Sequence, residues 1–213
     1  DIIYDQNNAY NLRIRKFIEK ILETVTKEDR SEKNWQLFET YAKQVFFSNG
    51  IHHHYSMDKI NPKFTQFWLI DICAKYNIKY EDALISVMFD PEVEAKRKVK
   101  SPDLDMVVAS ANNFYGEGVT QEMVEKYYSE RIKPNDPEPI EWGLNSTLEI
   151  GADGKLYENF WKSGGKYASS IQQIIYWLKQ ASEVTENYEQ RVALEKLIQY
   201  YQTGDLRTWD EYN

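Results

Sequence analysis

The sequence is informative first for what it lacks. Its 213 residues include one cysteine and three histidines, and no apolar run approaches the roughly 20 residues of a membrane-spanning helix. A lone Cys73 forms no internal disulfide, which excludes a disulfide-stapled secreted scaffold and indicates a small apolar core residue. The missing apolar run excludes a bilayer-spanning helix, so we expect no membrane partner.

Charge excludes a second class of partner. The chain carries 34 acidic and 26 basic side chains, a formal net charge of −8, which opposes binding to a polyanion. Its densest basic stretch, residues 96–100, is typical of a solvated helix end. We therefore expect no nucleic acid partner. The 42% hydrophobic and 15% aromatic content instead predicts a globular chain with a sizeable core.

The two ends of the sequence bear on its origin. Asp1 begins a polar stretch without an initiator Met, a basic leader or the apolar core of a targeting peptide. We expect a cytoplasmic location, and we leave export open because we also expect the natural polypeptide to begin before Asp1. The last predicted helix, over 206–212, contains Trp209 and Tyr212, so we expect the natural polypeptide to continue.

Apolar residues in the amino-terminal part recur at the spacing of amphipathic helices. One helix is expected over 8–27, and a second begins at a cap on Asp29 or Ser31 and ends at Asn49-Gly50. Residues 51–62 are expected to form a loop or short strand. Four more helices are expected: after Pro62, from Tyr80 to before Asp90-Pro91, over 102–109, and over 121–131 behind a Thr120 cap.

The carboxy-terminal part combines strands and helices. The turn at 151–154 predicts a β-hairpin of residues 147–150 and 155–159. Helices over 166–182 and 186–203, the second capped by Thr185 and stopped by Gly204, should pack as an antiparallel pair. Residues expected to face inward on the first of them are Tyr167, Ile171, Ile174, Ile175 and Leu178. Trp68 and Trp177 are both expected in the core, and Asp205 is expected to cap the last helix.

These elements define an α+β fold that is predominantly helical, with antiparallel helix pairs and a small β-hairpin. We divide it into a helical region over 1–132, a proline-rich linker over 133–142, and a hairpin plus helix pair over 143–213. All three are expected to belong to one lobe of a larger protein.

All three histidines lie together in the segment Ser48–Tyr55. In an extended strand His52 and His54 would point to the same side and could share a metal ion, but the sequence supplies no further ligands at a suitable spacing. The other interpretations are a hydrogen-bonding lining of a polar cleft and a purely structural loop. We favour the cleft lining, and predict no metal ligand in this chain.

Motifs for nucleophilic, metal or nucleotide chemistry are absent. The sequence contains no H-E-x-x-H, no phosphate-binding loop, no G-x-G-x-x-G and no G-x-S-x-G. Its paired carboxylates are typical of solvated helix faces. On these residues alone the chain is a helical domain without a self-contained active site. One interpretation is therefore a stand-alone helical peptide-binding or scaffold module that performs no catalysis.

Several segments taken together resemble one family. The first is Thr40–Pro62 (TYAKQVFFSNGIHHHYSMDKINP), in which a helix ends in a Ser-Asn-Gly turn and leads to Lys-x-x-Pro. The others are Asn112–Met123 (NNFYGEGVTQEM), the hairpin over 143–158, and the two helices that contain Gly165–Leu178 and Tyr200–Leu206. In their order and spacing these segments are similar to the zinc dipeptidyl peptidases of the dipeptidyl peptidase III type.

The resemblance implies a two-lobed metallopeptidase that removes dipeptides from the amino termini of short peptides in a wide cleft. Its zinc site uses an H-E-x-x-G-H helix and a later glutamate in an upper lobe that this sequence does not contain. The chain would then belong to the lower lobe and bind no cofactor itself. Zinc would belong to the full-length parent, and the partners would be short peptides and the missing zinc-binding lobe.

The resemblance also assigns roles to residues of the loop that follows the second helix, because this loop faces the peptide cleft in the family. Asn49 and Gly50 would shape the loop, while His52, His54 and Tyr55 would belong to the substrate-binding surface. Tyr55 takes the place of the family's peptide-contacting aromatic when one residue is skipped near the turn. None of the five is expected to be a catalytic base or a zinc ligand.

Overall fold

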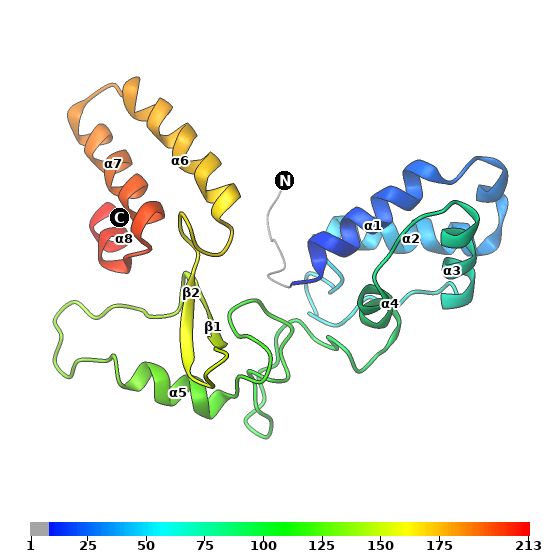
Figure 1. Ribbon diagram of the computed structural model, residues 1–213, viewed down its shortest axis with the longest axis horizontal. Helices are drawn as coiled ribbons and strands as arrows, with labels where there is room; N and C mark the ends of the chain where they lie inside the picture. Colours follow the sequence, from blue (N-terminus) through cyan, green and yellow to red (C-terminus); the bar gives the residue numbers. More distant parts are fainter. Residues whose placement is uncertain (1–8) are drawn as a thin grey trace. The chain divides into compact units, whose positions relative to one another are not determined.

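The computed structural model describes residues 9–213 and divides into two compact units, the first ending at Asn113 and the second running from Phe114 to Asn213. The elements of the first unit are α1 (Asn11–Thr24), a 3-10 turn η1 (Glu28–Ser31), α2 (Lys33–Ser48), α3 (Gln66–Lys75) and α4 (Asp82–Phe89). Those of the second unit are α5 (Gln121–Ser129), β1 (Ser146–Ile150), β2 (Leu156–Phe160), α6 (Ala168–Glu183), α7 (Tyr188–Thr203) and α8 (Leu206–Tyr212). Each label is shown in Figure 1.

The core of the first unit forms where α1, α2, α3 and α4 meet (Figure 1). The apolar stripe predicted for the first helix is buried, and Ile14, Ile18 and Ile21 have no exposed surface. Phe38 of α2 contacts Phe64 and Trp68 with ring centroids 5.5 and 5.9 Å apart. The core position expected for Trp68 is confirmed, and tilted and edge-on aromatic pairs of this kind add to the stability gained from burial.

Three predictions for the first unit need correction. Residue 8 of the predicted first helix lies outside the described residues, and α1 begins at Asn11. Neither Asp29 nor Ser31 caps α2, because the Asp29 carboxylate accepts from the Tyr76 hydroxyl at 2.6 Å and the Ser31 hydroxyl donates to the Glu28 carbonyl. Residues 102–109 form turns rather than a helix, since the Asp105 side chain accepts from the amides of Val107 and Val108 and so competes with helical bonding.

The β-hairpin of the second unit is confirmed. β1 and β2 are antiparallel with Leu148 opposite Glu158, and Gly151 donates to the Lys155 carbonyl at 2.8 Å to close the turn. A parallel bridge between Tyr115 and Leu148 adds one short segment to the sheet. The Glu158 carboxylate is nearly buried and accepts from Tyr128 of α5, so it ties this helix to the sheet.

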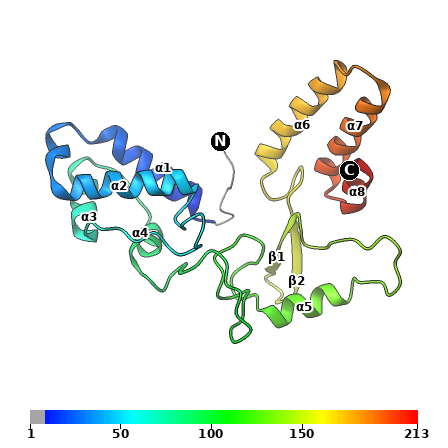
Figure 2. The same cartoon turned by 180° about the vertical axis from the view of Figure 1, so that it is seen from behind.

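The helices α6 and α7 run side by side and antiparallel (Figure 1; Figure 2). Gly204 ends α7 with a positive φ of 73°, and Asp205 caps α8 by accepting from the Arg207 amide, as expected. The α7 cap is Asn187 rather than Thr185, because the Asn187 side chain accepts from the Gln190 amide at 2.8 Å.

The outer face of α6 differs from the prediction. Of the residues expected to face inward, Ile171 and Ile175 are buried and Leu178 is half-buried. Ile174 is 39% exposed and Tyr167 is 49% exposed, and Trp177, expected in the core, is 66% exposed. The apolar arc of α6 is wide, and α7 covers only one side of it.

The fold class is confirmed: residues 9–213 contain eight α-helices and one two-stranded antiparallel sheet. The proline-rich segment 133–142 lies within the second unit, between α5 and β1, and its role as a linker between domains stays a prediction. Among the helices of the described part, none has both the length and the apolar character needed to cross a bilayer.

Candidate functional site

The loop that follows α2 begins at Asn49 and Gly50, where the helix ends as predicted. Asn49 has a left-handed backbone with φ 57°, and Gly50 has φ 156°. Their amides donate to the carbonyls of Phe46 and Val45 at 3.2 and 3.0 Å, which satisfies the last turn of the helix. Asparagine and glycine tolerate this conformation better than other residues, so the chain leaves α2 abruptly here.

The loop 51–60 is held by backbone hydrogen bonds to itself and to the segment 90–97. Ile60 donates to the Ile51 carbonyl at 2.8 Å, and the His53 amide donates to Asp58 at 2.7 Å. Arg97 donates to the Met57 carbonyl at 2.9 Å, so the two segments pair like short strands. The loop therefore has a defined conformation although it forms no regular strand.

His52 lies inside this pairing and has no exposed surface. Its Nε2 lies 2.7 Å from the Glu94 carbonyl oxygen, which only accepts, so Nε2 carries the proton. Burial lowers the pKa of His52, because the charged form would lose its hydration, while the bond to Glu94 acts in the opposite direction. The expected role of His52 in substrate binding stays a prediction, and in this conformation the ring supports the loop from within.

Lys59 supports the same loop from its other end. The residue is only 9% exposed, and its Nζ donates to the carbonyls of Asp90 and Val93, the latter at 2.7 Å. Asp90 is the C-cap of α4, so the ammonium group lies where the helix dipole favours a positive charge. Desolvation lowers the pKa of Lys59, and Asp90 and Glu94 oppose this effect.

The outer side of the loop is an exposed aromatic patch made of Phe47, His53, His54 and Tyr55. The rings of His53 and His54 stack with centroids 4.6 Å apart, and His54 lies edge-on to Phe47 at 5.1 Å and to Tyr55 at 5.7 Å. Phe47 is 78% exposed and Tyr55 84%. Exposed aromatic rings in contact with one another can pack against an extended ligand.

A turn at 53–57 explains why the histidines are not arranged as in a strand. Met57 donates to the His53 carbonyl at 2.9 Å, and Nδ1 of His53 accepts from the amides of Tyr55 and Ser56 at 3.2 Å each. The same-side arrangement of His52 and His54 is therefore wrong, because His52 is buried and His54 is exposed. Within residues 9–213 no group of three or more His, Cys, Asp or Glu side chains is arranged to hold a metal ion.

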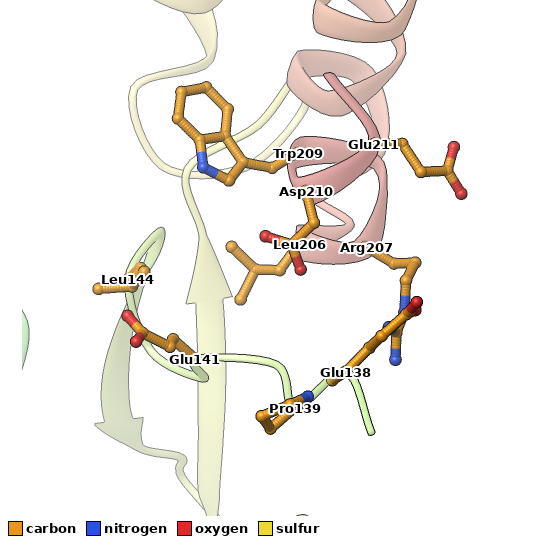
Figure 3. Close-up of a pocket in the computed structure, with 9 residues that line it drawn as sticks. All are labelled: Glu138, Pro139, Glu141, Leu144, Leu206, Arg207, Trp209, Asp210 and Glu211. Atoms are coloured by element: carbon orange, nitrogen blue, oxygen red, sulfur yellow. The ribbon is translucent and has the colours of Figure 1, made fainter. Parts of the chain in front are cut away.

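Sequence reasoning missed a second candidate site, an open pocket of about 520 Å³ in the second unit (Figure 3). It lies between α8 and the segment 138–144, and it is lined by Glu138, Pro139, Glu141, Leu144, Leu206, Arg207, Trp209, Asp210 and Glu211. Arg207 closes one side by donating to the Glu138 carbonyl and carboxylate at 3.0 and 3.2 Å. No sequence signal joined these segments, since they meet only through the fold.

Comparisons with known proteins add one observation. No protein-family profile and no curated protein matches the chain. Among solved structures, the chain is similar to dipeptidyl-peptidase III from Corallococcus sp. strain EGB, with a TM-score of 0.52 and 17% sequence identity over 98% of this chain. The likeness is one of fold. The chain spans 28% of the length of that structure's chain, so it resembles a part of a dipeptidyl-peptidase III.

The two candidate sites therefore belong to different compact units. The patch on the loop contains His54 and Tyr55 of the predicted substrate-binding residues, with Asn49 and Gly50 at its base. The pocket contains none of the residues predicted from the sequence. The patch offers exposed rings and few charges, whereas the pocket offers carboxylates beside apolar side chains.

Proposed function

We propose that this chain is part of a zinc-dependent dipeptidyl peptidase and contributes to its peptide-binding surface. The observation that supports the proposal most is the fold likeness to a dipeptidyl-peptidase III, which extends over 98% of the chain. The segment-by-segment resemblance of the sequence to the same family points in the same direction. On this proposal the chain alone does not hydrolyse peptides.

The peptide-binding role falls to the aromatic patch. Asn49 and Gly50 turn the chain out of α2. The buried His52 and Lys59 side chains then stabilise the loop through their hydrogen bonds to the segment 90–97. Tyr55 and His54 then remain exposed and available to contact an extended peptide. Stacking of aromatic rings against a peptide gives contact area at little cost in conformational entropy, since the rings already support one another.

The chemistry would lie elsewhere in the polypeptide. Zinc would be held by a second lobe that carries H-E-x-x-G-H, and when bound there it would supply activation of the water that hydrolyses the peptide bond. The coding sequence around these 213 residues tests this part. We expect an H-E-x-x-G-H downstream, and its absence would overturn the peptidase proposal.

The binding role is tested with the chain as it stands. We expect a tetrapeptide with a free amino terminus to bind weakly, and Tyr55→Ala to weaken this binding at least fivefold in isothermal titration. Tyr188→Ala is the matched control, because Tyr188 is a similarly exposed tyrosine of the other unit. Equal loss in both variants, or no loss in either, would contradict peptide binding by the patch.

A stand-alone peptide-binding or scaffold module would give a different combination of results. It would bind peptide through the patch while its gene encoded no zinc motif. The two experiments together therefore separate peptide binding by this chain from membership in a peptidase.

A further inference from the structure

The pocket of the second unit has an apolar floor and an acidic rim. Its apolar side chains are Pro139, Leu144, Leu206 and Trp209, and only Leu206 among them is buried. Four carboxylates line it, those of Glu138, Glu141, Asp210 and Glu211, against one basic group, Arg207. A ligand that enters must therefore suit both an apolar surface and a negative field.

Two of the four carboxylates already have partners. Glu138 accepts from Arg207, which also lies 3.8 Å from Asp136. Glu211 is ion-paired with Lys196, and in Figure 3 its side chain points away from the other lining residues. Each of the two therefore has a basic partner within the protein, and the partner of Glu138 is shared with Asp136.

Glu141 and Asp210 remain uncompensated. Among the residues that the structure describes, neither carboxylate has an ion pair or a side-chain hydrogen bond, and both residues are exposed at the rim. Both residues line the pocket, and Figure 3 shows them on different elements, Glu141 on the segment before β1 and Asp210 on α8. Two uncompensated negative charges thus border a pocket of mixed apolar and polar lining, which favours a positive group there and disfavours an anion.

Trp209 adds a surface suited to the same kind of ligand. Its ring contacts Tyr200 with centroids 5.0 Å apart and Tyr212 at 5.5 Å, so neighbouring rings hold its orientation. It is half-buried and lies next to Leu206 in the lining. Indole is the aromatic ring that attracts ammonium and guanidinium groups most strongly.

We propose that this pocket binds an organic cation, an alkylammonium group on an apolar stem. The stem would lie on Leu144, Leu206 and Trp209, and the ammonium group would lie between Glu141 and Asp210. A lysine side chain of a peptide and a free diamine share this chemistry. The site goes beyond the proposed function, because it lies in the other unit and needs no residue of the aromatic patch.

Titration of the 213-residue chain with two cations and one neutral analogue tests the proposal. The cations are N-acetyl-lysine methylamide and 1,5-diaminopentane, and the analogue is N-acetyl-norleucine methylamide, which keeps the apolar stem without the charge. We expect at least one cation to bind tenfold or more tightly than the analogue, with an affinity that falls as salt rises.

Charge-neutral variants locate the site. We expect Glu141→Gln with Asp210→Asn to weaken cation binding at least tenfold, and Glu211→Gln to change it less than twofold, because Glu211 is paired with Lys196. Trp209→Leu should weaken it about threefold or more, in line with a lost cation–π contact. These carboxylates are exposed, so the variants should keep the far-ultraviolet circular dichroism of the parent.

Each outcome decides something. Tighter binding of the lysine amide identifies a peptide side chain as the ligand, tighter binding of the diamine identifies a free amine, and equal binding supports the ammonium group alone as the recognised feature. Equal affinity for the neutral analogue, or unchanged binding in the double variant, overturns the proposal. Tyr55→Ala should leave cation binding unchanged, so failure of this site is distinct from failure of the peptide-binding patch.

Discussion

The conformation of the loop 51–60 should depend most on Lys59. Its Nζ donates to the carbonyls of Asp90 and Val93, and its backbone amide donates to Ala95 at 3.3 Å. Methionine has a similar length and fits an apolar site but donates no hydrogen bond. Lys59→Met therefore removes the two bonds while it keeps most of the packing.

The expected loss follows from two opposing contributions. A hydrogen bond with a charged donor contributes roughly 1.5–3 kcal/mol, so two such bonds to Asp90 and Val93 set the upper range of the loss. Against this, the variant avoids the desolvation of the ammonium group, which is the effect that lowers the pKa of Lys59. We expect the free energy of unfolding to fall by about 2 kcal/mol.

Urea denaturation measures the loss, and hydrogen exchange locates it. The matched control is Lys63→Met, because Lys63 is exposed and lies four residues away; a change below about 0.5 kcal/mol is expected there. In Lys59→Met the Arg97 amide, which bonds to Met57, should exchange faster than in the control. If both variants unfold at the same urea concentration and protect Arg97 equally, Lys59 does not hold the loop.

Three more predictions concern single residues elsewhere in the fold. Burial keeps the pKa of His52 below its ordinary value of 6.5, so the unfolded chain binds the proton more readily and the free energy of unfolding should fall as pH drops below 6.5. The urea midpoints at pH 7.5 and 5.5 should therefore differ more in the parent than in His52→Gln. An equal difference in the two proteins would contradict this. Burial also raises the pKa of the Cys73 thiol to about 11. A thiol reagent at pH 8 should therefore react roughly a hundredfold more slowly with the native chain than with the urea-unfolded chain. A fast reaction of the native chain would show the thiol to be accessible. A Cβ on Gly165 would lie 2.2 Å from the Phe160 carbonyl oxygen, so Gly165→Ala should lower the free energy of unfolding, measured by thermal denaturation, by about 2–4 kcal/mol. The control is Gly154→Ala, where the new Cβ meets no atom and only the positive φ of 77° is unfavourable, so a loss of about 1–2 kcal/mol is expected. Equal losses in the two variants would refute the contact.

Local signals in the sequence predicted most of the regular structure. The helix-ending Asn49-Gly50 pair, the caps at Thr120 and Asp205 and the hairpin turn each act within a few residues, so their chemistry could be read directly from the order of the chain. One of the wrong caps has a distant cause. Asp29 bonds to Tyr76, 47 residues away, and is therefore not available to α2.

The candidate sites depended more on distant contacts and were harder to predict. The sequence placed the three histidines together, but their separation into one buried and two exposed rings depends on the pairing of their loop with residues 90–97. The pocket depends on the approach of Glu141 and Leu144 to α8, which no periodicity indicates. The exposed Trp177 shows the same limit, because periodicity identifies an apolar face but not what covers it.

The histidine signals in a nuclear magnetic resonance spectrum test peptide binding by the aromatic patch most directly. The chain has three histidines, so its imidazole carbon–proton spectrum has few peaks to assign. On titration with a tetrapeptide, we expect the His53 and His54 peaks to shift and saturate together, and we expect Tyr55→Ala to reduce the shift. Unchanged His53 and His54 peaks at millimolar peptide would contradict the proposal that this patch binds peptide.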